Sequence, residues 1–484
     1  MMIFKTKISP LVVLIVVFGI VYSLISLVNH YNFRTNALDL GLYTNAMYDY
    51  THFQWNDSSL FRMFNENLLA DHFDLYLIIF SPLCLVFGTY TLLVVQIAAI
   101  LIGGWGVYSY FKGQKGHPVI PALAAFYFYS FFGVFGALSY DYHSNVVAAS
   151  LVPWFFYWVQ KRKLIPASLM LLFILVSKEN ISLWMTFVCL GLIVNCRKDS
   201  VLVKFLLVAA VFCAAYFLTI ITLVMPALSY SSTFAHFDYE YLGNGPVEAV
   251  VHLVMHPVDS FQTLFVNHHA NPKHDYIKTE LHVILLFSGL PFLLWKPQYL
   301  FMLIPIYFQK LFHNTHFMWG VGLQYNIEFA PILALGIFDV VSGITKPRLK
   351  TFLAWTAVVL VLAATIRTMD STVFYTNKAK VRFYQKQHYV RDYDVSEVYH
   401  QLSLLPSDAV LCVHSPILPH LALRDSLYEY PRIKNAEYIV YANHENFYIS
   451  GEQEFMRATD SLKHCDEWQV LYDKDITVLK RGVR

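Results

Sequence analysis

The chain has 484 residues, a formal net charge of +2, 57% hydrophobic residues and only 14% charged residues. A soluble domain usually carries about 25% charged residues, so this composition excludes a wholly soluble protein. No basic run or tail is present, and we expect no nucleic-acid partner. The composition therefore predicts an α-helical, polytopic membrane protein.

The first apolar run is expected to be a retained membrane span. Lys5 and Lys7 precede an uninterrupted apolar stretch from Ile8 to Val28. This stretch is longer than a signal-peptide core, and no small-residue cleavage site follows it. It reaches the roughly 20 residues that a bilayer-spanning helix requires.

Further apolar segments follow along the chain. Backbone groups inside hydrocarbon must bond within their own segment, so we expect each segment to be a helix. With the first run included, the segments are 8–28, 72–88, 90–111, 118–137, 144–160, 164–177, 180–195, 201–226, 280–295, 298–312, 321–341 and 350–368.

Basic residues in the short connections predict the orientation. They can all face the cytoplasm only if segment 72–88 does not cross, so we predict a juxtamembrane or re-entrant helix there and about eleven transmembrane helices. The N-terminus is then cytoplasmic, and loops 29–89 and 227–280 lie outside. Twelve spans with a reversed charge pattern remain an alternative. The basic clusters are Lys5/Lys7, Lys112/Lys115, Lys161–Lys163, Arg197/Lys198/Lys204, Lys296 and Lys346/Arg348/Lys350.

Residues 369–484 have a different character from residues 1–368, being charged and without a long apolar run. Their pattern predicts a small extracytoplasmic α/β domain. Cys412 and Cys465 lie in it, and both a disulfide and two separate thiols remain open. The predicted strands are Ala409–His414 and Tyr438–Tyr441, the predicted helix is Gly451–Lys463, and the predicted closing hairpin is Trp468–Tyr472 with Ile476–Leu479.

With this topology, polar residues gather on the outer face. Ionisable groups at membrane depth are costly, so they tend to line a cavity or pathway. Glu328 is expected inside a span, one helical turn from Gln324. Plainer roles remain open, because Asp39 can cap a helix and Lys178 with Glu179 can reach the headgroups. The candidate site residues are Asp39, Tyr43, Asp71, His72, Asp141, His143, Lys178, Glu179, Gln324 and Glu328.

The chemistry open to these residues is limited. The sequence has no phosphate-binding glycine loop, no dinucleotide fingerprint and no nucleophile elbow. Carboxylates with a lysine suit general-base catalysis together with the binding of an anionic phosphate. Aspartate and histidine can also hold a divalent cation, with Mg²⁺ or Mn²⁺ as candidates, and metal dependence stays open.

Several stretches resemble a known family of membrane proteins, the domain of unknown function 2079. That family in turn resembles the GT-C glycosyltransferase superfamily, which includes protein mannosyltransferases, aminoarabinose transferases and oligosaccharyltransferases. The matching stretches are Leu38–Tyr43, Asp71–Phe73, Tyr140–His143, Ser177–Asn180, and Leu418–Leu421 with Arg424.

The resemblance implies a membrane hexosyltransferase in the cell (inner) membrane. Such an enzyme would move a sugar from a polyprenyl-phosphate carrier to a glycan, lipid or protein acceptor. Asp39 matches the catalytic acid of the first outer loop and would act as the general base. Asp141 matches a second acid, and Lys178 a lysine that would meet the donor phosphate. The chain departs from the superfamily because it has a single acid at Asp39 and no Asp-x-Asp motif at Asp141.

Other interpretations of the same residues stay open. In a transporter or lipid flippase the charged groups would line a path, and Glu328 would relay protons. In a non-catalytic assembly protein the acids of the outer loops would tolerate substitution. The segment from Pro419 to Arg424 is predicted to pack the C-terminal domain, with a lid over the site as the alternative.

Overall fold

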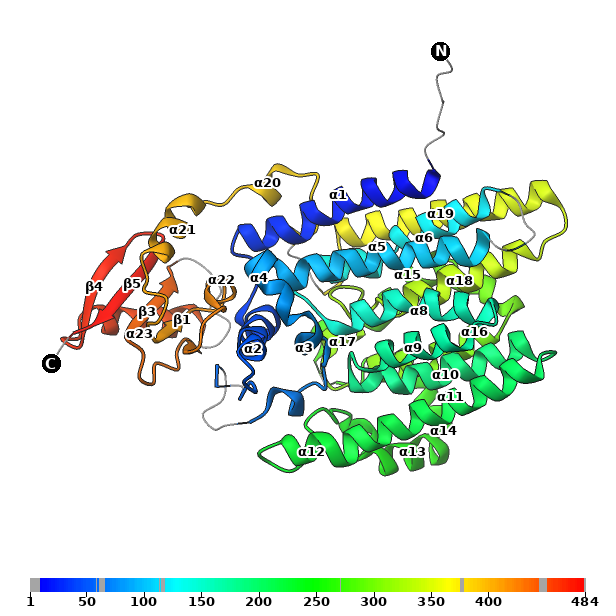
Figure 1. Cartoon of the computed structure of the whole chain (residues 1–484), viewed down its shortest axis with the longest axis horizontal. Coiled ribbons are helices and arrows are strands. Elements are labelled where there is room, and N and C mark those ends of the chain that lie inside the picture. The colour runs from blue at the N-terminus through cyan, green and yellow to red at the C-terminus, as the bar shows by residue number, and fades with distance from the viewer. Residues whose placement is uncertain are drawn as a thin grey trace, which may run out of the picture.

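The computed structural model is a bundle of long helices with a small α/β domain at one end (Figure 1). We call this the C-terminal domain, and the adjoining end of the bundle the domain end. The structure describes residues 9–57, 59–60, 66–112, 114, 118–269, 271–374, 378–443 and 451–482. Lys5, Lys7 and Lys115 lie outside these residues.

The bundle helices follow the apolar runs of the sequence. Their side chains are apolar on nearly all faces, because some face other helices and the rest face lipid. The helices are α1 (Pro10–Tyr31), α5 (Thr91–Lys112), α6 (Ile120–Tyr129), α7 (Phe132–Leu138), α8 (Ser144–Gln160), α9 (Leu164–Leu175), α10 (Glu179–Cys196), α11 (Ser200–Thr219), α15 (Ile277–Phe287), α16 (Gln298–Leu311), α18 (Phe329–Ser342) and α19 (Pro347–Asp370).

In the described part of the chain, five helical segments are long and apolar enough to cross a membrane. A sixth is added if α6 and α7, bent by 42°, count as one span. The prediction of a polytopic helical membrane protein is confirmed, while the number of eleven spans stays a prediction. The five segments are 10–31, 76–112, 179–196, 200–228 and 347–370.

The segment predicted to be juxtamembrane is broken into short turns. α3 (Tyr76–Phe80) and α4 (Cys84–Phe87) are separated by a 3₁₀ turn that contains Pro82. Gly88 has a φ of 55°, a conformation that favours glycine, and it redirects the chain into α5. Figure 1 shows α3, α4 and α2 (Leu42–Thr51) at the domain end of the bundle.

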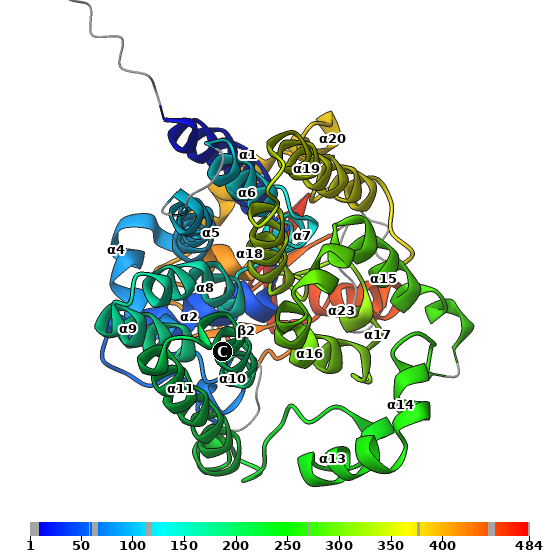
Figure 2. The same cartoon turned by 90° about the vertical axis from the view of Figure 1, so that its right-hand side faces the viewer.

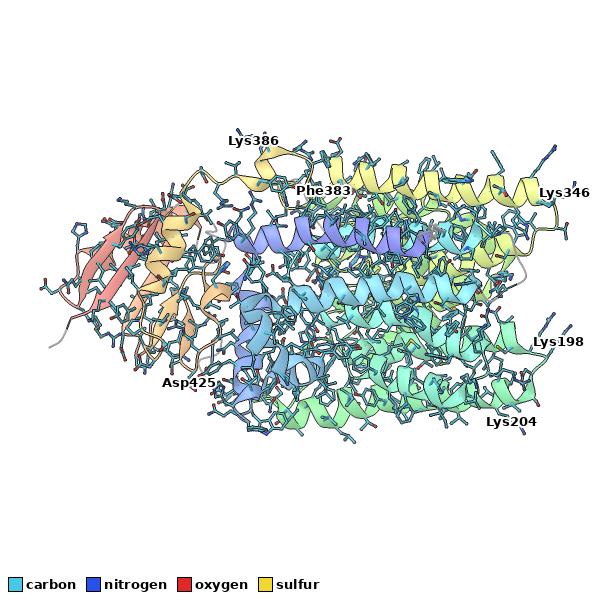
Figure 3. All side chains as sticks on the ribbon, turned by 45° about the horizontal axis from the view of Figure 1, so that its top comes forward. Lys198, Lys204, Lys346, Phe383, Lys386 and Asp425 are labelled. Atoms are coloured by element: carbon cyan, nitrogen blue, oxygen red, sulfur yellow. The ribbon has the colours of Figure 1, made fainter. Side chains whose placement is uncertain are left out.

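The basic connections lie at the other end of the bundle. Figure 3 shows Lys198, Lys204 and Lys346 at the end farthest from the C-terminal domain. The charge pattern thus separates the two ends of the molecule, as the sequence predicts. The assignment of the basic end to the cytoplasm remains the prediction of the charge rule.

One predicted span begins later than expected. Residues 320–327 form bends and turns, and α18 starts only at Phe329. Leu323 has a φ of 58°, and the Gly320 carbonyl accepts hydrogen bonds from the Asn326 amide at 3.1 Å and the Lys310 amine at 3.2 Å. The expectation that Gln324 and Glu328 share a helical turn is therefore wrong, because tertiary hydrogen bonds replace the helical ones.

Loop 227–280 contains two short helices, α13 (Pro246–Met255) and α14 (Pro257–Thr263). Pro257 separates them. Apolar side chains such as Val247 and Val254 are more than two-thirds exposed, and Figure 2 shows both helices at the margin of the bundle. Exposed apolar faces of this kind suit contact with lipid.

The C-terminal domain is a five-stranded sheet in the order β2-β1-β3-β5-β4. The predicted strands, helix and hairpin are confirmed, whereas β2 was not foreseen. Cys412 is buried in the central strand β1 and Cys465 is exposed beyond the helix, and both are free, so no disulfide joins them. The elements are β1 (Leu411–Val413), β2 (Leu427–Glu429), β3 (Tyr438–Ala442), β4 (Trp468–Asp473), β5 (Ile476–Arg481), α20 (Lys386–Tyr389), α21 (Val395–Ser403), α22 (Leu418–Leu421) and α23 (Glu452–Lys463).

We expect Gly104→Ala to destabilise the bundle. A Cβ atom at Gly104 would lie 2.1 Å from Cζ of Tyr129, whose hydroxyl is already fixed by a hydrogen bond to the Leu101 carbonyl at 2.6 Å. Overpacking of this kind costs about 1–3 kcal/mol. The thermal unfolding midpoint in detergent should fall, whereas Gly245→Ala, with no atom within 4 Å, should leave it unchanged. Equal midpoints for the two variants would contradict the packing argument.

Candidate functional site

The Asp39 loop (residues 36–41) connects α1 to α2 at the domain end. Asp39 has φ 69° and ψ −94°, and its side chain is 17% exposed. A positive φ at a residue other than glycine is uncommon and costs about 1–3 kcal/mol unless the surroundings fix it. Contacts from two distant parts of the chain hold this loop.

The first contact comes from Asp141, which follows α7. Its buried carboxylate accepts a hydrogen bond from the backbone N–H of Asn36 at 2.8 Å and another from the backbone of Leu40. Burial raises the pKa of Asp141 to about 7, against the opposing effects of Lys380 and the two backbone donors. The acid therefore holds the backbone on both sides of Asp39.

The second contact comes from the C-terminal domain. The Ser415 hydroxyl accepts a hydrogen bond from the backbone N–H of Ala37 at 3.1 Å. A Cβ atom at Gly41 would lie 2.6 Å from the Leu418 side chain, so only glycine lets α22 approach this closely. The segment predicted to pack the domain thus packs directly against the Asp39 loop.

The Asp39 carboxylate faces His143. The Nε2 atom of His143 lies 3.5 Å from Oδ1 of Asp39 and 2.9 Å from the amide nitrogen of Gln324, which donates to it. The backbone N–H of His143 donates to Gln96 Oε1 at 3.0 Å. Two glutamines therefore fix the imidazole beside the acid.

A second group, the lysine cluster, consists of Asp71, His72, Lys178, Glu179 and His236. His72 donates from Nδ1 to Glu179 at 3.2 Å and accepts at Nε2 from the Lys178 amine at 3.0 Å. His236 contacts Asp71 at 3.2 Å, and its ring stacks on that of His72 with centroids 4.3 Å apart.

The charges of the lysine cluster depend on each other. Burial and the nearby Lys178 lower the pKa of His72. Burial also acts to lower the pKa of His236, but its hydrogen bond with Asp71 outweighs this and raises it. Burial alone would raise the pKa of Asp71, yet His72, His236 and Lys178 hold it well below its usual range. The pKa values of the two stacked imidazoles are thus shifted in opposite directions.

Tyr43 lies between the two groups. Its ring is buried and meets that of Tyr142 edge-on, with centroids 6.1 Å apart. Burial raises its pKa well above the usual value, and the charges of Asp39 and Asp71 add to this. Charges of the Asp39 loop and of the lysine cluster thus both act on this one phenol.

Glu328 stands just before the first residue of α18. It is 8% exposed and accepts a hydrogen bond from the Asn145 amide at 2.7 Å. Among the described residues, no hydrogen bond joins it to Asp39 or to His72. Most of the predicted residues thus form two contact groups, one around Asp39 and one around Lys178, and Glu328 is held separately by Asn145.

His236 and Ser415 escaped the sequence analysis. His236 belongs to His236-Phe237-Asp238, which repeats the mixture of imidazole and acid found in Asp71–Asp74. That similarity was an available signal, although one histidine among twenty is weak evidence. Ser415 gave no signal at all, because its role depends only on where the domain docks.

Asp71, His72 and His236 have the geometry of a metal site. One ligand atom from each lies within 4.8 Å of the others. The hydrogen bond from His72 Nδ1 to Glu179 makes Nε2 the ligand atom, an arrangement typical of zinc-binding histidines, and a metal there would displace the Lys178 amine from Nε2. Two imidazoles and a carboxylate suit Zn²⁺ better than the Mg²⁺ or Mn²⁺ considered from sequence, since those ions prefer oxygen ligands.

We expect Zn²⁺ to bind to the purified protein and His236→Ala to reduce the bound metal at least tenfold. Elemental mass spectrometry after dialysis against Zn²⁺ gives the stoichiometry. His274→Ala is the matched control, because His274 lies outside the group and stacks on His316. Metal contents that are equal in the two variants would show that these residues hold no metal.

We also expect Asp141 to make stability depend on pH. An unfolded aspartate has a pKa of about 4, while that of Asp141 is about 7 in the folded protein. The folded state therefore binds the extra proton between these values, and the free energy of unfolding falls as the pH rises through this range. Thermal midpoints at pH 5 and pH 8 should differ less for Asp141→Asn than for the unaltered chain. An unchanged difference would contradict the assignment.

Comparison with known proteins shows similar folds. The chain resembles the arabinofuranosyltransferase AftD from Mycobacteria over 98% of its own length and 40% of AftD, with 11% identity and a TM-score of 0.50. It also resembles ArnT from Cupriavidus metallidurans, solved with undecaprenyl phosphate, over 98% of both chains, with 11% identity and a TM-score of 0.47. At this identity the likeness to AftD shows the fold alone, and the predicted GT-C-like fold is confirmed. The chain spans less than half of AftD.

No curated protein matches the sequence. A family of predicted membrane proteins, DUF2079, matches residues 29–470. Because this match covers most of the chain, the protein belongs to the DUF2079 family of membrane proteins.

Proposed function

We propose that this protein transfers a sugar from a polyprenyl-phosphate carrier to an acceptor at the domain end of the bundle, which is the extracytoplasmic end if the charge rule holds for the cell (inner) membrane. One observation carries the proposal: Asp39 is held in a strained conformation against His143, with Lys178 and its partners across Tyr43. Strained residues fixed by their surroundings are typical of active sites.

The phosphate of the donor would bind at Lys178. Among the described residues the amine makes one hydrogen bond, to His72 at 3.0 Å, and an ammonium group has three donors. Two donors therefore remain for phosphate oxygens. Lys178 immediately precedes α10, a membrane-spanning helix, so a phosphate on a lipid carrier meets it at the membrane boundary.

Asp39 would act as the general base. Its carboxylate takes the proton of the acceptor hydroxyl while that oxygen bonds to the anomeric carbon on the side opposite the phosphate. The bond from the anomeric carbon to the phosphate oxygen breaks, and its electron pair leaves with the polyprenyl phosphate. The configuration at the anomeric carbon is inverted, and Asp39 then releases the proton to solvent. The His143 ring packs beside this carboxylate, with Nε2 3.5 Å from Oδ1.

Asp141 would position the site without touching the substrate. Its carboxylate is 1% exposed and bonds the backbone of the Asp39 loop. Its proposed role is therefore to hold Asp39 in place. From its place in the sequence, Asp141 was a second candidate for a catalytic residue. In this proposal Asp39 is the only catalytic acid.

The location of the polar groups favours an enzyme over a transporter. Lys178 and His143 both stand next to the first residue of a bundle helix, at the starts of α10 and α8. A transport path needs polar groups through the depth of the membrane. The gathering of charges at one end supports chemistry at that end.

We expect Asp39→Asn to lower the rate of transfer by about 10²–10⁴-fold, which is the usual contribution of a general base. Asparagine tolerates a positive φ, so the loop should keep its shape. The measurement is transfer of radiolabel from a polyprenyl-phosphate sugar in membranes that contain the variant. Asp57→Asn, in the same outer segment and away from His143, should retain full activity. An Asp39→Asn protein with more than half of the activity would remove the base assignment.

A further inference from the structure

A cavity of about 480 Å³ lies between α15 and α19, and we call it the α15/α19 groove. Away from the domain end its lining is apolar and lies at the surface of the bundle, with Val283, Phe287 and Ala363. Towards the domain end the lining turns polar, with Glu280 and Arg367. The polar end of the groove matches a lipid head group, and its apolar part matches a hydrocarbon chain.

Glu280 lacks a hydrogen-bond partner for one of its oxygens. The residue is 9% exposed, and Oε2 accepts from the backbone N–H of Val373 at 2.9 Å. Oε1 has no hydrogen-bond partner in the described part of the chain and lies 3.7 Å from the Arg367 guanidinium. Buried polar atoms are normally hydrogen-bonded, so Oε1 is suited to accept a hydrogen bond from a ligand hydroxyl.

The mouth of the groove is positively charged. Arg367 has a side chain that is 51% exposed, and Lys378 also acts on Glu280. The half-exposed Arg367 guanidinium is therefore open to a further anionic group, and phosphate is the anionic group of common membrane lipids.

A smaller cavity of about 20 Å³ shares Glu280 with the groove and is lined by Gly322, Leu323 and Thr372. Leu323 precedes Gln324, whose amide donates to His143 beside Asp39. The turns at 320–327 therefore stand between the groove and Asp39. Lys178 precedes α10, and Figure 2 shows α10 on the other side of α16 and α18 from α15 and α19. The groove and Lys178 thus lie on opposite sides of α16 and α18.

We infer that the α15/α19 groove binds the acceptor, and that this acceptor is an anionic, hydroxyl-bearing lipid. Its hydrocarbon chain lies along Val283 and Phe287, its phosphate meets Arg367, and a head-group hydroxyl donates to Glu280. That the lipid is the acceptor rests on the proposed function. That the groove binds the lipid can be tested without turnover. The donor carrier stays on the side of Lys178.

The test uses the full chain in nanodiscs of equal parts phosphatidylglycerol and phosphatidylcholine. Phosphatidylglycerol carries both a phosphate and free hydroxyls, and native mass spectrometry counts the lipids that stay bound. We expect the unaltered chain to retain phosphatidylglycerol preferentially, and Arg367→Gln and Ala363→Trp to reduce this retention at least fivefold. Val208→Trp, on the lipid-facing side of α11, is the control and should change nothing. Equal retention of both lipids, or the same loss in Val208→Trp, would overturn the inference.

A second arm separates acceptor from donor. Undecaprenyl phosphate is added to the nanodiscs, and its retention should fall at least fivefold in Lys178→Gln and stay unchanged in Ala363→Trp. The reverse pattern would assign the groove to the donor and overturn the inference. Both arms measure bound lipid without turnover, so full activity of Asp39→Asn would refute the proposed function and leave these binding results interpretable.

Discussion

The site depends on the bond between the Asp141 carboxylate and the backbone of the Asp39 loop. Asp39 adopts a conformation that an isolated loop would not keep. Asn36 and Leu40, on both sides of it, donate to one buried acid that lies about a hundred residues further along the chain. The geometry of the base is therefore a tertiary property, and it exists only when α7 is packed against α1.

The C-terminal domain also holds the Asp39 loop in place. Ser415 bonds the backbone of Ala37, and the side-chain amide of Asn45, on α2, donates to the carbonyl of Arg424 at 2.8 Å. Arg424 is buried and donates to the carbonyls of Leu421 and Pro406, so it fixes the turn that follows α22. The stretches by which the sequence resembles its family thus meet in space, and the domain is part of the site.

Sequence predicts the elements whose cause is local and misses those whose cause is tertiary. Apolar runs predict the bundle because lipid forces backbone groups to bond within a segment, and alternating residues predict the hairpin of β4 and β5. The turns at 320–327 depend on Lys310 and Asn326 reaching the Gly320 carbonyl, which no local pattern encodes. His236 joins the lysine cluster from a distant loop, so the cluster was predicted only in part.

The two imidazoles of the lysine cluster have different chemical roles because their environments differ. Burial and Lys178 favour the neutral form of His72, whereas the bond to Asp71 favours the protonated form of His236. Groups whose pKa values are driven apart in this way usually divide the work of a site. With His236 protonated, Glu179 and Asp71 balance Lys178 and His236, so a phosphate arriving at Lys178 adds a negative charge that is not offset within the lysine cluster. A divalent cation held by Asp71 and the two imidazoles would replace the proton of His236 and add one further positive charge, so metal binding and donor binding should strengthen each other.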